Sequence, residues 1–114
     1  MPTLGVCLGH QAVVHAYGGE IGQAKTLVHG KATAVVHDGR GIFTGLEPEL
    51  EAGRYHSLAA TRIPECLEIS ARDSEGEVMA VRHRELSVDG VQFHPESVLT
   101  PDGPELCRNF LAGR

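Results

Sequence analysis

A cysteine between two glycines near the start of the chain has the setting of a catalytic nucleophile. The segment Gly5-Val6-Cys7-Leu8-Gly9 follows an apolar stretch, and glycines on both sides allow a sharp turn from a strand into a helix. Such a turn exposes the middle side chain at the start of the helix, where free backbone N–H groups and the helix dipole favour a thiolate. The pattern predicts that Cys7 is a nucleophile. The alternative is a buried, unreactive thiol.

A histidine and a glutamate near the other end of the chain supply the groups that a cysteine nucleophile needs. His94 and Glu96 flank Pro95, and residues two apart in an extended segment project to the same side. A carboxylate on one ring nitrogen leaves the other nitrogen free to exchange a proton with the sulfur. With Cys7, these residues predict a Cys–His–Glu triad. Taken alone, His94 would be an ordinary surface histidine in a turn.

The remaining histidines and cysteines show no metal-binding pattern. No two of these histidines lie four apart on a predicted helix, and no cysteine pair has the spacing of a metal site. We therefore expect no metal in this chain and structural positions for His10, His15, His29, His37, His56, His83, Cys66 and Cys107.

The composition indicates one ordinary globular domain over residues 1–114. The chain has 41% hydrophobic and 22% charged residues and a net charge of -5, with no basic surface pattern for nucleic acid. No apolar stretch reaches the ~20 residues that cross a bilayer, and no signal peptide is recognisable. Three cysteines, an odd number, indicate reduced thiols rather than a disulfide framework. We expect a cytoplasmic protein that binds neither nucleic acid nor membrane.

The hydrophobic pattern predicts an α/β fold. An early strand–turn–helix is followed by several strands and a closing helix. Because the strand before a nucleophile turn usually lies between parallel neighbours, we expect an open mixed, mainly parallel sheet flanked by helices, truncated at the amino-terminal side. The expected strands are residues 1–6, 32–36, 55–61, 67–72, 78–83 and 88–93, and the expected helices are residues 8–17 and 104–111.

Four segments, in order along nearly the whole chain, resemble the triad-type (class I) glutamine amidotransferases. More narrowly, they are similar to the small subunits of anthranilate synthase and aminodeoxychorismate (p-aminobenzoate) synthase. The segments are Gly5-Val6-Cys7-Leu8-Gly9-His10-Gln11, His29-Gly30-Lys31, Arg54-Tyr55-His56-Ser57-Leu58 and Gly90-Val91-Gln92-Phe93-His94-Pro95-Glu96-Ser97.

The resemblance implies that glutamine is hydrolysed to glutamate and ammonia through a γ-glutamyl thioester on Cys7. In this interpretation His94 is the acid and base, and Glu96 is its partner. The ammonia would pass to a large, chorismate-using synthase subunit, with anthranilate preferred slightly over p-aminobenzoate as the product. The resemblance implies no cofactor in this chain, although the partner subunit is expected to use Mg²⁺.

The resemblance also assigns the residues that contact glutamine. The side chain of Gln11 and backbone groups of Ser57 and Leu58 would bind it, and the N–H of Leu8 would supply half of the oxyanion hole. The segment His29-Gly30-Lys31 is expected near the interface with the large subunit.

The sequence departs from the family pattern before the nucleophile. Family members carry an amino-terminal portion with a Pro-Gly-Pro-Gly loop, which supplies glutamine contacts and the second oxyanion donor, and this sequence does not contain that portion. We therefore expect the carboxy-terminal part of such an enzyme. Two alternatives stay open: a non-catalytic remnant that binds a synthase subunit, and an unrelated cysteine hydrolase with the same triad.

Overall fold

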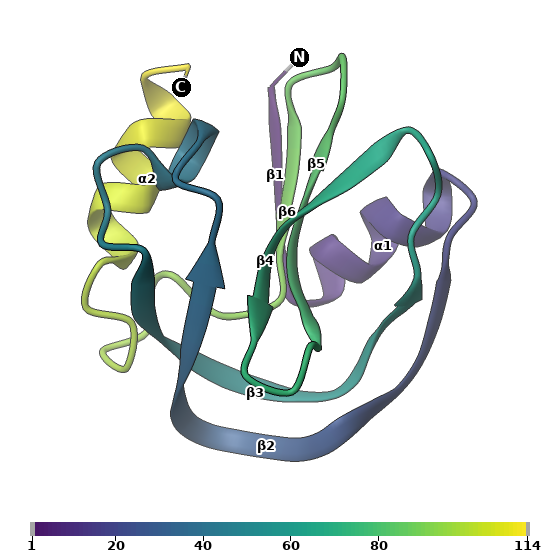
Figure 1. Cartoon of the computed structure of the whole chain (residues 1–114), viewed down its shortest axis with the longest axis horizontal. Coiled ribbons are helices and arrows are strands. Elements are labelled where there is room, and N and C mark those ends of the chain that lie inside the picture. Colours follow the sequence, from purple (N-terminus) through teal and green to yellow (C-terminus); the bar gives the residue numbers. More distant parts are fainter. Residues whose placement is uncertain (1, 114) are drawn as a thin grey trace.

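The computed structural model describes residues 2–113, apart from the side chains of residues 26–29. One strand precedes the first α-helix, and a run of strands separates it from the second α-helix near the end of the chain (Figure 1). The elements are β1 (Thr3–Val6), α1 (Leu8–Ala16), β2 (Glu20–His37), the 3-10 turn η1 (Gly41–Phe43), β3 (Glu49–Arg62), β4 (Leu67–Asp73), β5 (Val78–His83), β6 (Val88–Val91) and α2 (Gly103–Leu111).

The described strands form a single mixed sheet in the order β1-β6-β5-β4-β2-β3. This arrangement confirms the expected α/β class with a mixed sheet. The expectation of a mainly parallel sheet is wrong for the described residues, because only β1 and β6 pair in parallel. The reason is connectivity: short turns, such as residues 74–77 between β4 and β5, join antiparallel neighbours, whereas parallel pairs need a long crossover.

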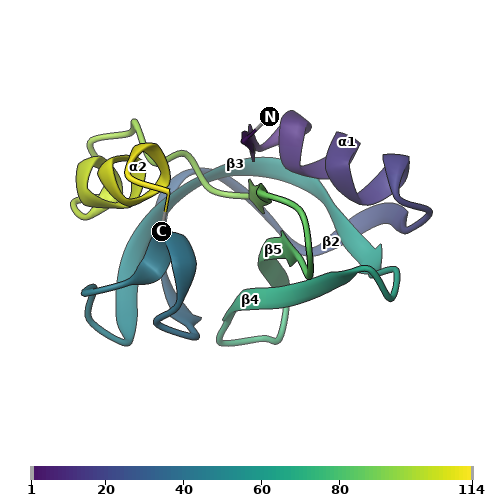
Figure 2. The ribbon, with the colours of Figure 1, turned by 90° about the horizontal axis from the view of Figure 1, so that it is seen from above.

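The strands expected at residues 32–36 and 55–61 are parts of one long hairpin. β2 and β3 pair in antiparallel fashion, with register shifts between Gln23 and Val28 and between His29 and Lys31. Extra residues of this kind bend a strand and increase its twist. The hairpin accordingly curls around the rest of the sheet, as the view from above shows (Figure 2). This curvature brings the middle of β3 toward the carboxyl ends of β1 and β6.

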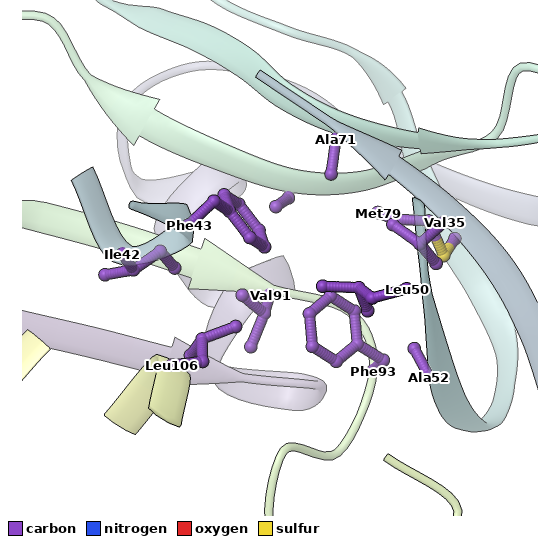
Figure 3. Packing of buried hydrophobic residues seen from close by; sticks show 11 residues of the cluster. Val35, Ile42, Phe43, Leu50, Ala52, Ala71, Met79, Val91, Phe93 and Leu106 are labelled. Carbon is purple, nitrogen blue, oxygen red and sulfur yellow. The ribbon is translucent and has the colours of Figure 1, made fainter. Parts of the chain in front are cut away.

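The apolar core lies in two clusters. Neighbouring residues of β5 serve different clusters, Ala80 the first and Val81 the second, because side chains alternate between the faces of a strand. The first cluster (Figure 3) contains Val35, Ile42, Phe43, Leu50, Ala52, Ala71, Met79, Ala80, Val91, Phe93 and Leu106. Burial of Phe93 in this cluster anchors the segment that leads into His94.

Both α-helices have nine residues, and no described helix has the length and apolarity to cross a membrane. The helix expected at residues 8–17 ends at Ala16, and the closing helix begins at Gly103, one residue before its proline. Proline suits this first turn because the N–H that it lacks has no partner within the helix.

Candidate active site

Cys7 lies in a strained turn between β1 and α1, as the glycine pattern predicted. Its φ of 54° and ψ of -101° put it in the left-handed half of conformational space, and among the described residues it is the only non-glycine with a positive φ. The turn is held by Cys7 N–H, which donates to Val91 O at 2.8 Å. Gly5 is required here, since a Cβ would lie 2.5 Å from Gly9 O. Strain of this type persists where the surrounding structure enforces it, often at functional sites.

His94 and Glu96 form the expected pair. Nδ1 of His94 lies 2.6 Å from Oε2 of Glu96, and because an ionised carboxylate only accepts, Nδ1 carries the hydrogen and Nε2 stays available. The His94 backbone is fixed on both sides: its N–H donates to Gly53 O at 3.0 Å, and its carbonyl accepts from Thr100 Oγ1 at 2.7 Å. The ring also meets Tyr55 edge-on, with centroids 5.2 Å apart.

The parallel pairing of β1 and β6 brings Cys7 and His94 to one edge of the sheet. Val6 is in register with Val91, so both chains leave the sheet at their carboxyl ends side by side. No hydrogen bond joins the Cys7 sulfur to the His94 ring in the described residues. Catalytic hydrogen bonds are commonly long without substrate and tighten when it binds.

A cavity of about 250 Å³ opens beside the sulfur. It contains every residue that the resemblance assigns to glutamine binding, from two separate parts of the chain. The lining residues are Cys7, Leu8, Gln11, Tyr55, His56, Ser57 and Leu58. His94 adjoins this cavity through its ring contact with Tyr55.

Burial raises the pKa of the Cys7 thiol above its ordinary value of 9.0. The N–H of Leu8 and the side chain of Gln92 donate to the sulfur and lower the pKa, whereas the charge of Glu96 raises it. The helix start lowers this pKa, as expected, but burial outweighs its effect. The thiol needs a base to become a nucleophile.

A buried amide beside the sulfur, Gln92, has a place in the site that was not predicted from the sequence. Gln92 Nε2 lies 3.6 Å from Cys7 Sγ, and Gln92 Oε1 accepts from Gln11 Nε2 at 3.2 Å. Gln11 Nε2 also donates to Leu58 O at 3.1 Å. The signal was present, because Gln92 stands two residues before His94 in one extended segment.

A hydrogen-bonded network that was not predicted holds the Ser57–Leu58 backbone on the opposite side of the cavity from the sulfur. Arg54 and Asp73 form an ion pair at 2.8 Å, with side chains only 3% and 5% exposed. Arg54 Nε donates to Nε2 of His56 at 2.9 Å, so Nδ1 of His56 carries the hydrogen and donates to Leu58 O at 2.9 Å. His56 is thus structural, as expected, but its structural role is to hold the Ser57–Leu58 backbone.

The segment His29-Gly30-Lys31 runs beside the cavity wall. His29 pairs with Tyr55 in the hairpin register, and its side chain lies outside the described residues. Gly30 and Lys31 are exposed. The expectation that this segment lies near a partner interface stays a prediction. Within the described residues, no group of three or more His, Cys, Asp or Glu side chains is arranged to hold a metal ion.

From the burial of His10 on α1 we predict that the stability of the fold depends on pH. His10 is fully buried, and burial lowers its pKa from 6.5 to about 4. Between pH 6.5 and 4 the unfolded chain binds a proton that the folded chain rejects, so stability falls by about 3 kcal/mol as the pH drops through this window. His56, whose pKa burial also lowers, acts in the same direction.

Asp89 on β6 has the opposite effect on the pH dependence of stability, and replacing it tests this prediction. Burial raises its pKa from 3.8 to about 6, so the folded state retains a proton there that the unfolded state has lost, and stability rises as the pH drops from 6 to 3.8. We expect Asp89→Asn to lose stability more steeply than the unchanged chain between pH 6.5 and 4. Urea unfolding across this range measures both slopes, and parallel curves would contradict the prediction.

The fold and site together define an α/β domain in which a cysteine in a strained turn and a histidine–carboxylate pair lie at the carboxyl edge of the sheet. The family model "Glutamine amidotransferase class-I" matches residues 1–113. The chain belongs to this family.

Similar proteins come from several organisms. "Anthranilate synthase component 2" of Haloferax volcanii is 58% identical over 114 residues, covering 97% of this chain and 56% of that protein. "Aminodeoxychorismate synthase component 2" of Klebsiella aerogenes is 50% identical, covering 96% of this chain and 60% of that protein. The chain therefore spans little more than half the length of these relatives.

A solved structure has nearly the same fold. A putative GMP synthase protein from Thermoplasma acidophilum aligns with a TM-score of 0.92 and 28% identity, covering 97% of this chain and 56% of that one. A glutamine amidotransferase from Thermotoga maritima aligns with a TM-score of 0.75 at 19% identity and covers 97% of this chain and 45% of that one. These alignments confirm the fold class.

Proposed function

We propose that the chain carries a glutaminase site in which Cys7 attacks the side-chain amide carbon of glutamine. The observation that carries the proposal is a cysteine in a left-handed turn beside a cavity, with a histidine–carboxylate pair leaving the sheet at the same edge. A strained nucleophile turn and an oriented imidazole are what acyl transfer through a thioester requires.

The proposed reaction has two steps. His94 accepts the thiol proton at Nε2 while the sulfur bonds to the amide carbon, and it then gives the proton to the departing nitrogen, which leaves as ammonia. The γ-glutamyl thioester on Cys7 is next attacked by water, from which His94 takes a proton. Glutamate leaves and the thiol is restored. Glu96 holds Nδ1 throughout and stabilises the imidazolium.

Three groups would stabilise and orient the substrate. The Leu8 N–H already donates toward the sulfur, so it lies close to the place where the oxygen of the attacked carbonyl becomes an oxyanion. One such donor contributes about 10²–10³ in rate. Both hydrogens of Gln11 Nε2 are used within the protein, so Gln11 Oε1 remains to accept a hydrogen bond from glutamine. The exposed Ser57–Leu58 backbone faces the same cavity.

We further propose that the ammonia passes to a chorismate-using synthase subunit. The support is the naming of the relatives, which are second components of anthranilate and aminodeoxychorismate synthases. Anthranilate is our preferred product, p-aminobenzoate the next. The three free cysteines fit a reducing compartment, and we propose the cytoplasm.

The test is affinity labelling with a glutamine analogue that carries a chloromethyl ketone in place of the amide. We expect the label on Cys7 alone, with protection by glutamine but not by asparagine, because the cavity positions the side-chain carbonyl at the sulfur. Mass spectrometry of the digested protein identifies the labelled residue. Labelling of Cys66 or Cys107 instead, or labelling of Cys7 without protection by glutamine, would overturn the proposal.

A further inference from the structure

Gln92 is a polar side chain in an unusual position. It is fully buried, and a buried amide is unfavourable unless both of its ends have hydrogen-bond partners. Its backbone N–H donates to Met79 O at 2.7 Å, which fixes the residue on the sheet edge. Its side chain then spans from Gln11 to the sulfur of Cys7.

The orientation of this amide is determined by its neighbour. Gln11 Nε2 has two hydrogens, and they go to Leu58 O at 3.1 Å and Gln92 Oε1 at 3.2 Å. If the Gln92 amide were reversed, its NH₂ group would face the NH₂ group of Gln11, and the hydrogen bond between the two side chains would be lost. The NH₂ end of Gln92 must therefore point at Cys7 Sγ, 3.6 Å away.

We propose that Gln92 is a further catalytic residue, whose amide donates a hydrogen bond to the Cys7 sulfur and stabilises the thiolate that forms when the base removes the proton. This inference rests on the proposed function of Cys7. A charged acceptor binds a donor more strongly than a neutral one does, so the bond strengthens as the thiolate forms. The N–H of Leu8 donates to the same sulfur from the helix start, and together the two donors counteract burial.

Other titratable groups near the sulfur also influence the Cys7 pKa. His94 and Glu96 approach from the segment after β6, His56 lines the cavity from β3, and His10 is buried on α1. None of them is altered when Gln92 is replaced, so a change in the Cys7 pKa would report the amide itself.

The test is the pH dependence of Cys7 alkylation by iodoacetamide in the chain without glutamine. We expect Gln92→Met, which keeps the size and removes the donor, to raise the Cys7 pKa by about one unit and slow alkylation near neutral pH about tenfold. Mass spectrometry follows Cys7 separately, and Cys66 and Cys107 serve as internal references. Gln11→Met removes the donor that orients the Gln92 amide, and it should raise the Cys7 pKa by a smaller amount.

A matched control is Asn109→Leu. Asn109 is also a buried amide with two hydrogen bonds, from Nδ2 to Ile42 O and Thr44 O, but it lies on α2 away from the cavity. We expect Asn109→Leu to lower the free energy of unfolding and to leave the Cys7 pKa unchanged. An unchanged Cys7 pKa in Gln92→Met overturns the inference. If Gln92→Met does not fold, an unchanged Cys7 pKa in Gln11→Met overturns the inference instead. Because no glutamine is present, a failure of the glutaminase proposal is recognised separately by the affinity label.

Discussion

Replacing the Cys7 sulfur by oxygen in Cys7→Ser is expected to abolish glutamate release from glutamine, by a factor of about 10³ or more. A serine hydroxyl is much harder to deprotonate than a thiol, and the His94–Glu96 pair lies near the sulfur without a hydrogen bond to it in the absence of substrate. The measurement is glutamate formation by the chain in complex with a chorismate-using synthase subunit. Product formation from glutamine should stop, whereas formation from added ammonia should continue.

The matched control for this prediction is Cys107→Ser. Cys107 is another free, half-buried cysteine, on α2 and outside the cavity that Cys7 lines. We expect glutamate release to be unchanged in this variant. Continued synthesis from glutamine in Cys7→Ser would remove Cys7 from the role of nucleophile. Loss of synthesis from ammonia as well would mean that the synthase subunit itself is inactive in that preparation.

Breaking the buried ion pair in Arg54→Met should lower the free energy of unfolding by about 3–5 kcal/mol. The substitution leaves the carboxylate of Asp73, only 5% exposed, without its cationic partner. It also removes the donor to Nε2 of His56, so the hydrogen on Nδ1 that holds Leu58 O is no longer determined. We therefore expect a higher KM for glutamine in the protein that remains folded. Urea unfolding measures the first effect, and glutaminase kinetics measure the second.

Arg62→Met is the comparison for this variant. Arg62 lies at the end of the same strand and pairs with Glu20 at 3.0 Å, but the two side chains are 56% and 65% exposed. Exposed ion pairs contribute less than about 1 kcal/mol because water and salt screen them. Equal losses of stability in the two variants would show that burial of the Arg54 pair has no special effect.

The nucleophile turn and the base pair were predictable from the sequence because each depends on neighbouring residues. Gly5 allows the close approach between β1 and α1 at the Cys7 turn, and the spacing of His94 and Glu96 determines their contact. The helix after Cys7 and the β4–β5 hairpin were predictable for the same reason, since local hydrophobic periodicity and turn residues define them.

The sheet required the tertiary structure. Pairing direction and curvature depend on which strands meet, and the register shifts that bend β2 leave no clear pattern in the sequence. That curvature brings His56 and Leu58 opposite Cys7, so the full cavity could be assembled from the sequence only through the family resemblance.

The sequence by itself determined which residues have the chemistry: a thiol in a tight turn and an imidazole next to a carboxylate. Only the tertiary structure decided how that chemistry is tuned. Burial raises the Cys7 pKa, and Gln92, just after β6, and Arg54, on β3, are the donors to Cys7 and His56. The physical reason is that burial and long-range hydrogen bonds depend on the packing of the whole chain, whereas turns and short spacings depend on adjacent residues.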